Sequence, residues 1–452
     1  MTIRPGQQLV SLGPHVSGQV MTHPAQRANF GRVAGLIERL RALEQLADFY
    51  EFQRLLFSLT YEAEERRGQC SRMIKRLRRG RGAPQDAPPP PPNSGDPSLK
   101  ESWEQEAYVF ERLARQLRTV GDGFAWRCFG YNRQVIQALS RNDSAGPMYG
   151  KVGLPSELGT IQHLWESGGH FALHHDLTNC LRIADLTEFT GDGGALLHEV
   201  KRTPRTEKMQ MDRAQAAINA LMDGGDLPGG RPGARLVQLD EPYVTNLKQL
   251  GELIELAKEH GCQGMALSQG RALIASSLPA SLRIWGTDHE AQGQALATAR
   301  RETIEQAGIA DALHHIKGIS GDTAARQPIL APWSIYPFPP ADCAALICDL
   351  LMFETITSDR ALTEGFERAG LRGEVLLTPS SGHLARAMDV VRSHLGQRAL
   401  TWHAYGLSVL LFELAEPDTL TRGSAELLRM ASPPPEPTIA YTGEAETWLP
   451  RR

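Results

Sequence analysis

The spacing of apolar residues predicts helices over residues 27–80. Four leucines between Leu36 and Leu46 recur at the three- and four-residue steps of an amphipathic helix. A second apolar pattern runs from Phe52 to Leu59. A further helix is expected to begin around Ser102 and to run towards Leu117.

Residues 150–285 alternate strand-like and helix-like segments, which indicates an α/β fold. Ser156 can cap a helix from Glu157 to about Glu166, in which Glu157 lies on the same face as Ile161. The strands expected after it are His170–His175, Leu181–Phe189 and Ala195–Arg202. Towards the C-terminus we expect helices near 341–354 and 360–370 and strands at 374–378 and 407–412.

Proline-rich composition marks the clearest domain boundary. The stretch 83–97, APQDAPPPPPNSGDP, has the composition of an extended polyproline spacer. The expected organisation is therefore a helical N-terminal region (1–82), this linker, a central α/β domain (98–330), a smaller α/β C-terminal region (331–432) and a disordered tail (433–452).

Composition and charge narrow the class of protein. Of 452 residues, 41% are hydrophobic and 22% charged, as in soluble globular proteins, and no apolar run is long enough for a membrane span. Six cysteines without a CxxC pair favour reduced thiols in a cytoplasm. The net charge of −4 predicts no general attraction to nucleic acid, so binding would need a local basic surface. The basic run from Arg66 to Arg81 is such a surface or, more commonly, a solvated helix end.

Three residues in the middle of the chain suggest metal chemistry. Asp185 lies among apolar strand residues, and Glu199 and Lys201 share one strand face because strand side chains repeat every two residues. Charges in such places are costly unless they pair or bind a metal. A hairpin through 190–194 can place Asp185 opposite Glu199, giving two carboxylates for Mg²⁺ or Mn²⁺. Lysine is scarce, with 8 Lys against 40 Arg, so Lys201 at this position is informative.

The segments SELGTIQHLW, RIADLTEF, ALLHEVKR and EKMQMDRAQAAI resemble the PD-(D/E)XK nuclease superfamily, which has the restriction-endonuclease-like fold. The resemblance implies a mixed central sheet flanked by helices and a magnesium-dependent nuclease that hydrolyses phosphodiester bonds. DNA is the favoured substrate over RNA, and a role in bacterial antiviral defence follows only by analogy. The resemblance implies that Glu157, Asp185 and Glu199 bind the metal and take part in catalysis together with Lys201 and Gln210. Arg202 and Arg213 are expected to contact phosphates of the substrate.

The sequence is also compatible with other functions. The nuclease fold could be catalytically retired and act as a binding or scaffolding module. The N-terminal helical region or the C-terminal region could hold a second copy or a partner protein. His170, His174, His175 and Asp176 could bind zinc if helical, but the expected strand favours structural histidines. Asp122, between two glycines, is expected in a turn.

Overall fold

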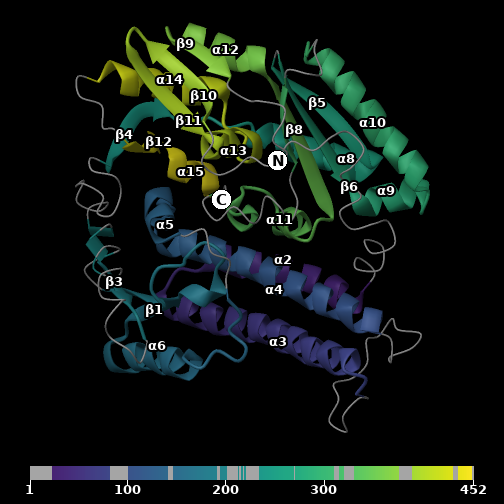
Figure 1. The fold of residues 1–452 in the computed structure, drawn as a ribbon, viewed down its shortest axis with the longest axis vertical. Coiled ribbons are helices and arrows are strands. Elements are labelled where there is room, and N and C mark those ends of the chain that lie inside the picture. The colour runs from purple at the N-terminus through teal and green to yellow at the C-terminus, as the bar shows by residue number, and fades with distance from the viewer. Residues whose placement is uncertain are drawn as a thin grey trace. The chain divides into compact units, whose positions relative to one another are not determined.

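The protein folds into two compact units, N-terminal and C-terminal (Figure 1). The computed structural model describes residues 23–81, 100–140, 146–190, 194–200, 212, 215–216, 218–219, 234–268, 270–309, 315–319, 330–375, 389–430 and 436–449. The described residues up to 219 and Pro332–Ile335 belong to the N-terminal unit, and the others to the C-terminal unit. The expected domain of 98–330 is therefore divided between the two units. Its described residues up to 219 lie in the same unit as the helical region that precedes the linker.

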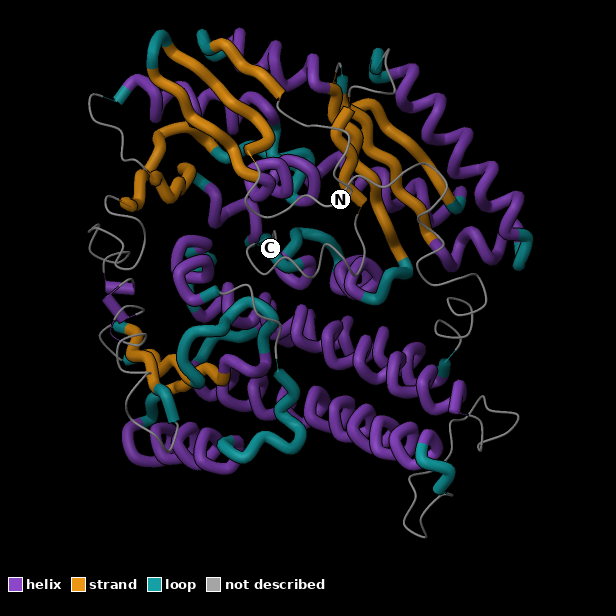
Figure 2. The backbone as a smooth tube through the Cα atoms, viewed as in Figure 1, coloured by secondary structure: helices purple, strands orange, loops and turns teal. Residues whose placement is uncertain are grey.

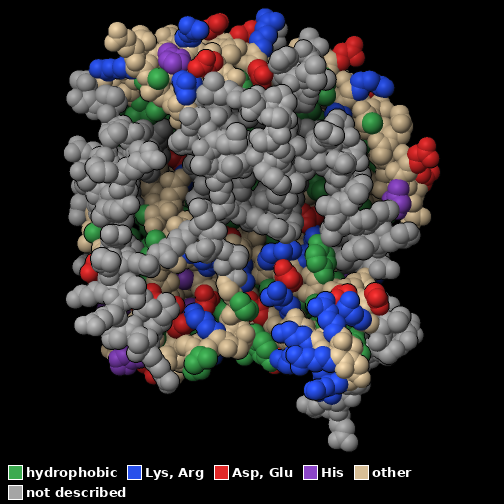
Figure 3. Space-filling view, viewed as in Figure 1, with side chains coloured by type: hydrophobic (Ala, Val, Ile, Leu, Met, Phe, Trp, Pro, Cys, Tyr) green, Lys and Arg blue, Asp and Glu red, His purple; other side chains and the backbone are tan. Residues whose placement is uncertain are grey.

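The N-terminal unit is mainly helical (Figure 2). Its helices are α2 (Pro24–Ala42), α3 (Leu46–Arg78), α4 (Lys100–Cys128), α5 (Arg133–Leu139) and α6 (Leu154–Gly168). Most of the apolar stripe predicted in the first 80 residues is buried, with Leu36, Leu40 and Leu56 at most 2% exposed, but Leu46 is 51% exposed. Lys and Arg side chains gather over the C-terminal end of α3 (Figure 3). The expected helices over 27–80 are confirmed.

Helix α4 continues through the glycines that were expected to form a turn. Gly121 lies so close to the backbone of Leu177 that a Cβ would approach its carbonyl oxygen to 1.9 Å. A Cβ on Gly123 would lie 2.2 Å from the Oγ of Ser334. These glycines therefore permit close packing within a helix, and the predicted turn at Asp122 is wrong.

A three-stranded antiparallel sheet of order β1–β2–β3 completes the N-terminal unit. Its strands are β1 (Phe171–His174), β2 (Leu186–Phe189) and β3 (Ala195–His198). The expected strand from Leu181 is shorter, because Ala184 has a φ of 67° that extended backbone does not adopt. On one face, Ala172 and Leu186 pack on Ile161 of α6.

Glutamine side chains cover backbone groups on both outer strands of this sheet. Gln53 of α3 donates to the carbonyl of Ala172 at 2.8 Å and accepts from the amide of His174 at 2.9 Å. On the other side, Gln215 donates to Ala195 at 2.7 Å and accepts from Leu197 at 2.9 Å. These contacts satisfy edge groups that would otherwise be open to pairing with another strand.

The C-terminal unit contains three small sheets. An antiparallel sheet of order β5–β6–β8–β7, a second of order β11–β10–β9, and a parallel pair β12–β4 account for its strands in the described residues. The strands are β4 (Ala234–Pro242), β5 (Cys262–Ser268), β6 (Arg271–Ser277), β7 (His315–Ile319), β8 (Leu351–Ser358), β9 (Arg372–Val375), β10 (Asp389–Leu395), β11 (Arg398–His403) and β12 (Glu436–Thr442). The helices are α8 (Leu247–His260), α9 (Leu278–Trp285), α10 (His289–Gln306), α11 (Pro340–Ile347), α12 (Asp359–Arg368), α13 (Ala404–Phe412), α14 (Pro417–Arg429) and α15 (Glu444–Trp448). The class is mixed α/β, as expected, but the described strands form several small sheets and not one mixed central sheet.

Two C-terminal expectations are wrong. Residues 407–412 belong to helix α13 and not to a strand, because a short, continuously apolar run has no period that separates the two structures. The tail expected to be disordered contains β12, which pairs with β4, and α15. Trp448 at its end is fully buried and stacks on Tyr336, with ring centroids 5.5 Å apart.

Two further properties concern the chain as a whole. In the described part of the chain, no helix combines the length and the apolar character needed to cross a membrane. All six cysteines are free, which agrees with the expected reduced thiols. The linker at 83–97 lies outside the described residues.

Candidate functional site

Three acidic side chains converge on the ammonium group of Lys151. Its Nζ lies 2.7 Å from Oδ2 of Asp176, 2.8 Å from Oε1 of Glu157 and 3.4 Å from Oδ1 of Asp185. The lysine is 28% exposed, whereas Glu157 is 2% and Asp185 10% exposed. We call these four residues and His174 the acidic cluster.

Each member of the cluster comes from a different piece of local structure. Lys151 lies in the segment before α6, and Glu157 lies in the first turn of that helix, on the face that buries Ile161. Asp176 belongs to the 3-10 helix η2 (His175–Leu177), which follows β1 directly. Asp185 immediately precedes β2. The short sheet and α6 therefore bring together residues up to 34 positions apart in the chain.

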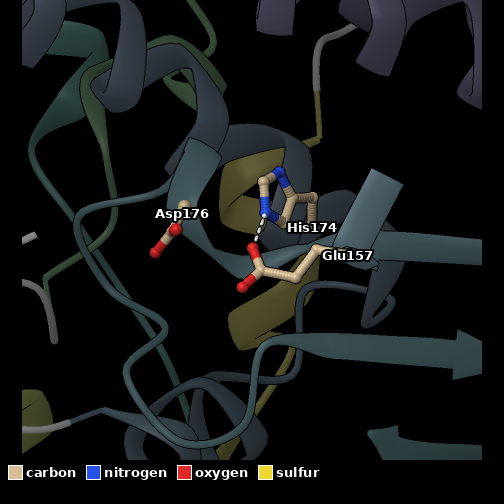
Figure 4. Close-up of side chains that lie close together, drawn as sticks. All are labelled: Glu157, His174 and Asp176. Carbon is tan, nitrogen blue, oxygen red and sulfur yellow. Dashed lines mark hydrogen bonds and ion pairs between the residues drawn. The ribbon is translucent and has the colours of Figure 1, made fainter. Parts of the chain in front are cut away.

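His174 joins the cluster from the end of β1. Its Nε2 lies 3.0 Å from Oε2 of Glu157, and its side chain is 1% exposed. Figure 4 shows Glu157, His174 and Asp176 around one space, and each can place one ligand atom within 4.8 Å of the others. Carboxylates suit Mg²⁺ and Mn²⁺, and an added imidazole suits ions such as Zn²⁺ or Fe²⁺. The donor set therefore fits a divalent metal.

Formal charge also favours a cation at the cluster. Glu157, Asp176 and Asp185 contribute −3 and Lys151 contributes +1, so these four residues sum to −2. Excess negative charge in a half-buried site is costly unless it is neutralised. A divalent cation would balance this charge.

Electrostatic interactions in the cluster hold Glu157, Asp176 and Lys151 in their charged forms. Burial opposes the charge of Glu157, but hydrogen bonds with His174 and Lys151 outweigh it and lower the pKa of this carboxyl group. Burial acts in the same way on Asp176, where the nearby His174 and Lys151 lower the pKa. For Lys151, burial is outweighed by the hydrogen bonds with Asp176 and Glu157, which raise the pKa of the ammonium group. Glu157 and Asp176 are thus carboxylates on either side of a protonated lysine.

Buried polar residues of α3 and α4 fix the backbone that carries the cluster. Glu64 accepts from the amides of Met148 at 2.6 Å and Tyr149 at 3.1 Å, just before Lys151. Arg118 pairs with Glu64 at 2.5 Å and donates to the carbonyl of Asp176 at 3.0 Å. The two long helices therefore position both the lysine and one of its acids.

Asp122 of α4 supports the segment that follows η2. Its Oδ1 accepts from the amides of Asn179 at 2.6 Å and Cys180 at 2.9 Å. Complete burial raises the pKa of this carboxyl group, against the opposing effect of these hydrogen bonds. Asp122 is a structural residue that anchors the connection from η2 towards Asp185.

The hairpin of β2 and β3 places Asp185 where the sequence predicted. Leu186 pairs with His198, so one further step of the register sets Asp185 across from Glu199. The amide of Asp185 donates to the carbonyl of His198 at 3.0 Å, and its Oδ2 accepts from the amide of Val200 at 2.9 Å. The unusual φ of Ala184 redirects the chain just before this aspartate.

Only part of the predicted site can be located. Glu157 and Asp185 meet in the acidic cluster through Lys151, and Glu199 follows β3 across from Asp185. The remaining predicted residues, Lys201, Arg202, Gln210 and Arg213, lie outside the described residues. Of the three expected metal ligands, Glu157 alone belongs to the described group that can hold an ion.

The sequence analysis missed three members of the cluster. The scarcity of lysine could have drawn attention to Lys151, but no sequence motif relates this residue to Asp185. His174 and Asp176 were noticed in the histidine-rich segment and judged structural. Their partners are Glu157 and Lys151, which no local pattern reveals.

The remaining histidines have structural partners. His175 is buried, its Nε2 lies 2.7 Å from Oγ1 of Thr187, and burial lowers its pKa to about 3. His170 and His198 contact the two oxygens of Glu188 at 2.6 and 2.7 Å. This fits the expectation of structural histidines at His170 and His175.

Comparison of the chain with protein-family models, curated proteins and solved structures found no match.

Proposed function

We propose that the chain is a metal-dependent nuclease that hydrolyses phosphodiester bonds of nucleic acid, with DNA the preferred substrate. The observation that carries this proposal is the convergence of three carboxylates, Glu157, Asp176 and Asp185, on one half-buried point with excess negative charge. Two of these acids are the helix and strand acids that the PD-(D/E)XK resemblance implies. The third, Asp176, adds a ligand that the resemblance does not assign.

The residues of the cluster have distinct roles in this proposal. Glu157, Asp176, Asp185 and His174 would hold Mg²⁺ or Mn²⁺, which supplies charge stabilisation at a phosphate and a more acidic water. Glu199, across from Asp185, would be a further acidic ligand. A metal would compete with the ammonium group of Lys151 for these carboxylates, and the displaced ammonium group could stabilise negative charge that develops on a phosphate oxygen. Lys201 is proposed to act on the attacking water, as the resemblance implies.

The buried scaffold supports such a role because it positions the acids before any substrate binds. Gln53 fixes the amide of His174, and the Glu64–Arg118 pair fixes the backbone of Tyr149 and Asp176. Side chains that are held in advance lose little freedom when charge develops, which is the basis of electrostatic catalysis.

Cleavage of supercoiled plasmid and single-stranded DNA with Mg²⁺ or Mn²⁺ tests the proposal. The wild type should cut, and Asp185→Asn and Glu157→Gln should each lower the rate by at least about a hundredfold, as loss of a key charge-stabilising group does. Glu188→Gln is the matched control, because it removes a carboxylate of the same sheet whose ion-pair partners in the described residues are His170 and His198. It should cut at nearly the wild-type rate. Equal cutting by all variants would contradict the site.

A second candidate is a retired nuclease fold that acts as a binding module. It is favoured by one observation: Lys151 already places a cation between the three acids. In this case the cluster is a stabilising ion-pair network and needs no metal. Manganese binding followed by electron paramagnetic resonance separates the candidates, since an active site should bind Mn²⁺ and lose it in Asp185→Asn. No Mn²⁺ binding by the wild type would select the retired fold.

A further inference from the structure

The C-terminal end of α3 carries a dense and one-sided positive charge. Residues 66–81 contain eight basic and no acidic side chains, in a chain whose net charge is −4. Four of them, Arg72, Lys75, Arg76 and Arg79, follow steps of three and four residues and therefore share one face of the helix. We call these four residues the basic stripe. Figure 3 shows Lys and Arg side chains gathered over this end of the helix.

Three of the four basic residues outside the stripe pair with acids of α4. Arg66 pairs with the buried Glu106 at 2.8 Å, and Arg67 and Arg78 pair with Glu111 and Glu104. These charges stabilise the helix pair. They leave the stripe as a separate surface feature.

The exposed members of the stripe are available to a ligand. Lys75 and Arg79 are both exposed. Within the described ranges neither side chain has a hydrogen bond or ion pair. The like charges of Lys75 and Arg79, four residues apart, repel one another, because like-charged pairs at this spacing are destabilising. A polyanion would relieve this repulsion.

The stripe begins beside the loop that carries Lys151 of the acidic cluster. Arg72 donates to the hydroxyl of Tyr149 at 3.1 Å, and its guanidinium lies 5.6 Å from the ring centroid. Gly68 lets this ring pack against α3, since a Cβ there would lie 2.8 Å from it. Tyr149 is two residues from Lys151 of the cluster. One loop therefore links the basic stripe to the acids.

We propose that the basic stripe binds the phosphodiester backbone of nucleic acid and leads it towards the acidic cluster. The inference rests on the proposed nuclease function and adds the surface that holds the substrate. Arg72 and Arg79 are about 10 Å apart along the helix at about 1.5 Å per residue. One strand of a duplex carries a phosphate about every 3.4 Å, so this length spans about three phosphates. The overall negative charge of the chain makes such a local surface necessary for binding.

Salt dependence of binding tests the stripe directly. The dissociation constant of the full chain for a DNA duplex, and for an RNA of the same sequence, is measured by fluorescence anisotropy over a range of salt concentrations without divalent metal. The double variant Lys75→Gln/Arg79→Gln should bind more weakly, and the slope of log affinity against log salt should fall by about 1.8 for the duplex, at about 0.9 per lost phosphate contact. The nucleic acid, DNA duplex or RNA, whose affinity falls more in the double variant relative to the wild type is the one that the stripe prefers.

The control is Lys248→Gln/Arg360→Gln, which removes the same charge from two helices of the C-terminal unit. These side chains are 74% and 80% exposed. The control should keep the wild-type slope. An unchanged slope in the stripe variant, or an equal fall in both variants, would overturn the inference. Binding to vesicles of anionic lipid but not to either nucleic acid would also overturn it.

The salt-dependence test of the stripe and the cleavage test of the proposed nuclease can fail independently. Metal-dependent cutting together with an unchanged slope in the stripe variant would reject the stripe and keep the nuclease. A stripe-dependent slope with no cutting under any metal would keep the binding surface and reject catalysis.

Discussion

Replacing Lys151 by methionine removes the ammonium group that lies between Glu157, Asp176 and Asp185. Methionine keeps the length of the side chain and its apolar stem. The change therefore isolates the charge from the packing. Without metal, three carboxylates then face one another in a half-buried site, and the folded protein should lose stability.

The structure sets the size of this loss. Removing one partner from a buried ion pair costs about 3–5 kcal/mol. Glu157 is 2% exposed but Lys151 is 28% exposed, so solvent screens part of the interaction and the lower end applies. A loss of about 3 kcal/mol lowers the melting temperature by about 6–12 °C, at about 2–4 °C per kcal/mol for a domain of about 150–250 residues.

Differential scanning calorimetry in chelator and in Mn²⁺ measures the effect. In chelator, Lys151→Met should melt well below the wild type, and the control Lys248→Met should not, because that lysine is 74% exposed and 3.8 Å from its acid. At about a hundred times the dissociation constant, a bound metal stabilises by about 2.7 kcal/mol. Mn²⁺ should therefore restore much of the stability of Lys151→Met and raise that of the wild type less.

Two results would refute this reasoning. A loss below about 1 kcal/mol in chelator, the range of exposed pairs, would mean that the ammonium group does not balance the acids. An equal rise of both melting temperatures in Mn²⁺ would mean that the lysine and the metal do not compete for the same carboxylates.

Three further outcomes are expected. Gly121→Ala should cost at least about 2 kcal/mol in urea unfolding, because its Cβ would lie 1.9 Å from the carbonyl oxygen of Leu177, whereas Gly159→Ala, with open space around it, should be neutral or stabilising. The pKa of Glu188 is held below its usual 4.5, since its histidine partners outweigh burial, so the advantage of wild type over Glu188→Gln should shrink as the pH falls below 4.5. A constant advantage between pH 7 and pH 3 would contradict this. Trp448→Ala should cost about 3–5 kcal/mol, because the side chain is fully buried, and a change near zero would restore the expectation of a disordered tail.

Much of the N-terminal unit could be predicted from local pattern. Leucines at helical spacing determined the long helices, since only one face of each could be buried. The turn residues between Phe189 and Ala195 and the two-residue strand period determined a register in which Asp185 lies across from Glu199. These features depend on neighbours in the sequence, so the sequence alone contains them.

Burial and long-range pairing decided the rest. Gly121 looked like a turn residue because the close approach of Leu177 is invisible in the sequence. The apolar run at 407–412 is compatible with a strand or a helix until its surroundings are known.

The composition of the acidic cluster was decided in the same way. Lys151 and Asp176 became members because α3 and α4 hold their backbones in place through Glu64 and Arg118. Periodicity determines which face a side chain occupies, but the energy of a charge depends on what the folded chain places beside it. The identity of this site was therefore set by tertiary structure.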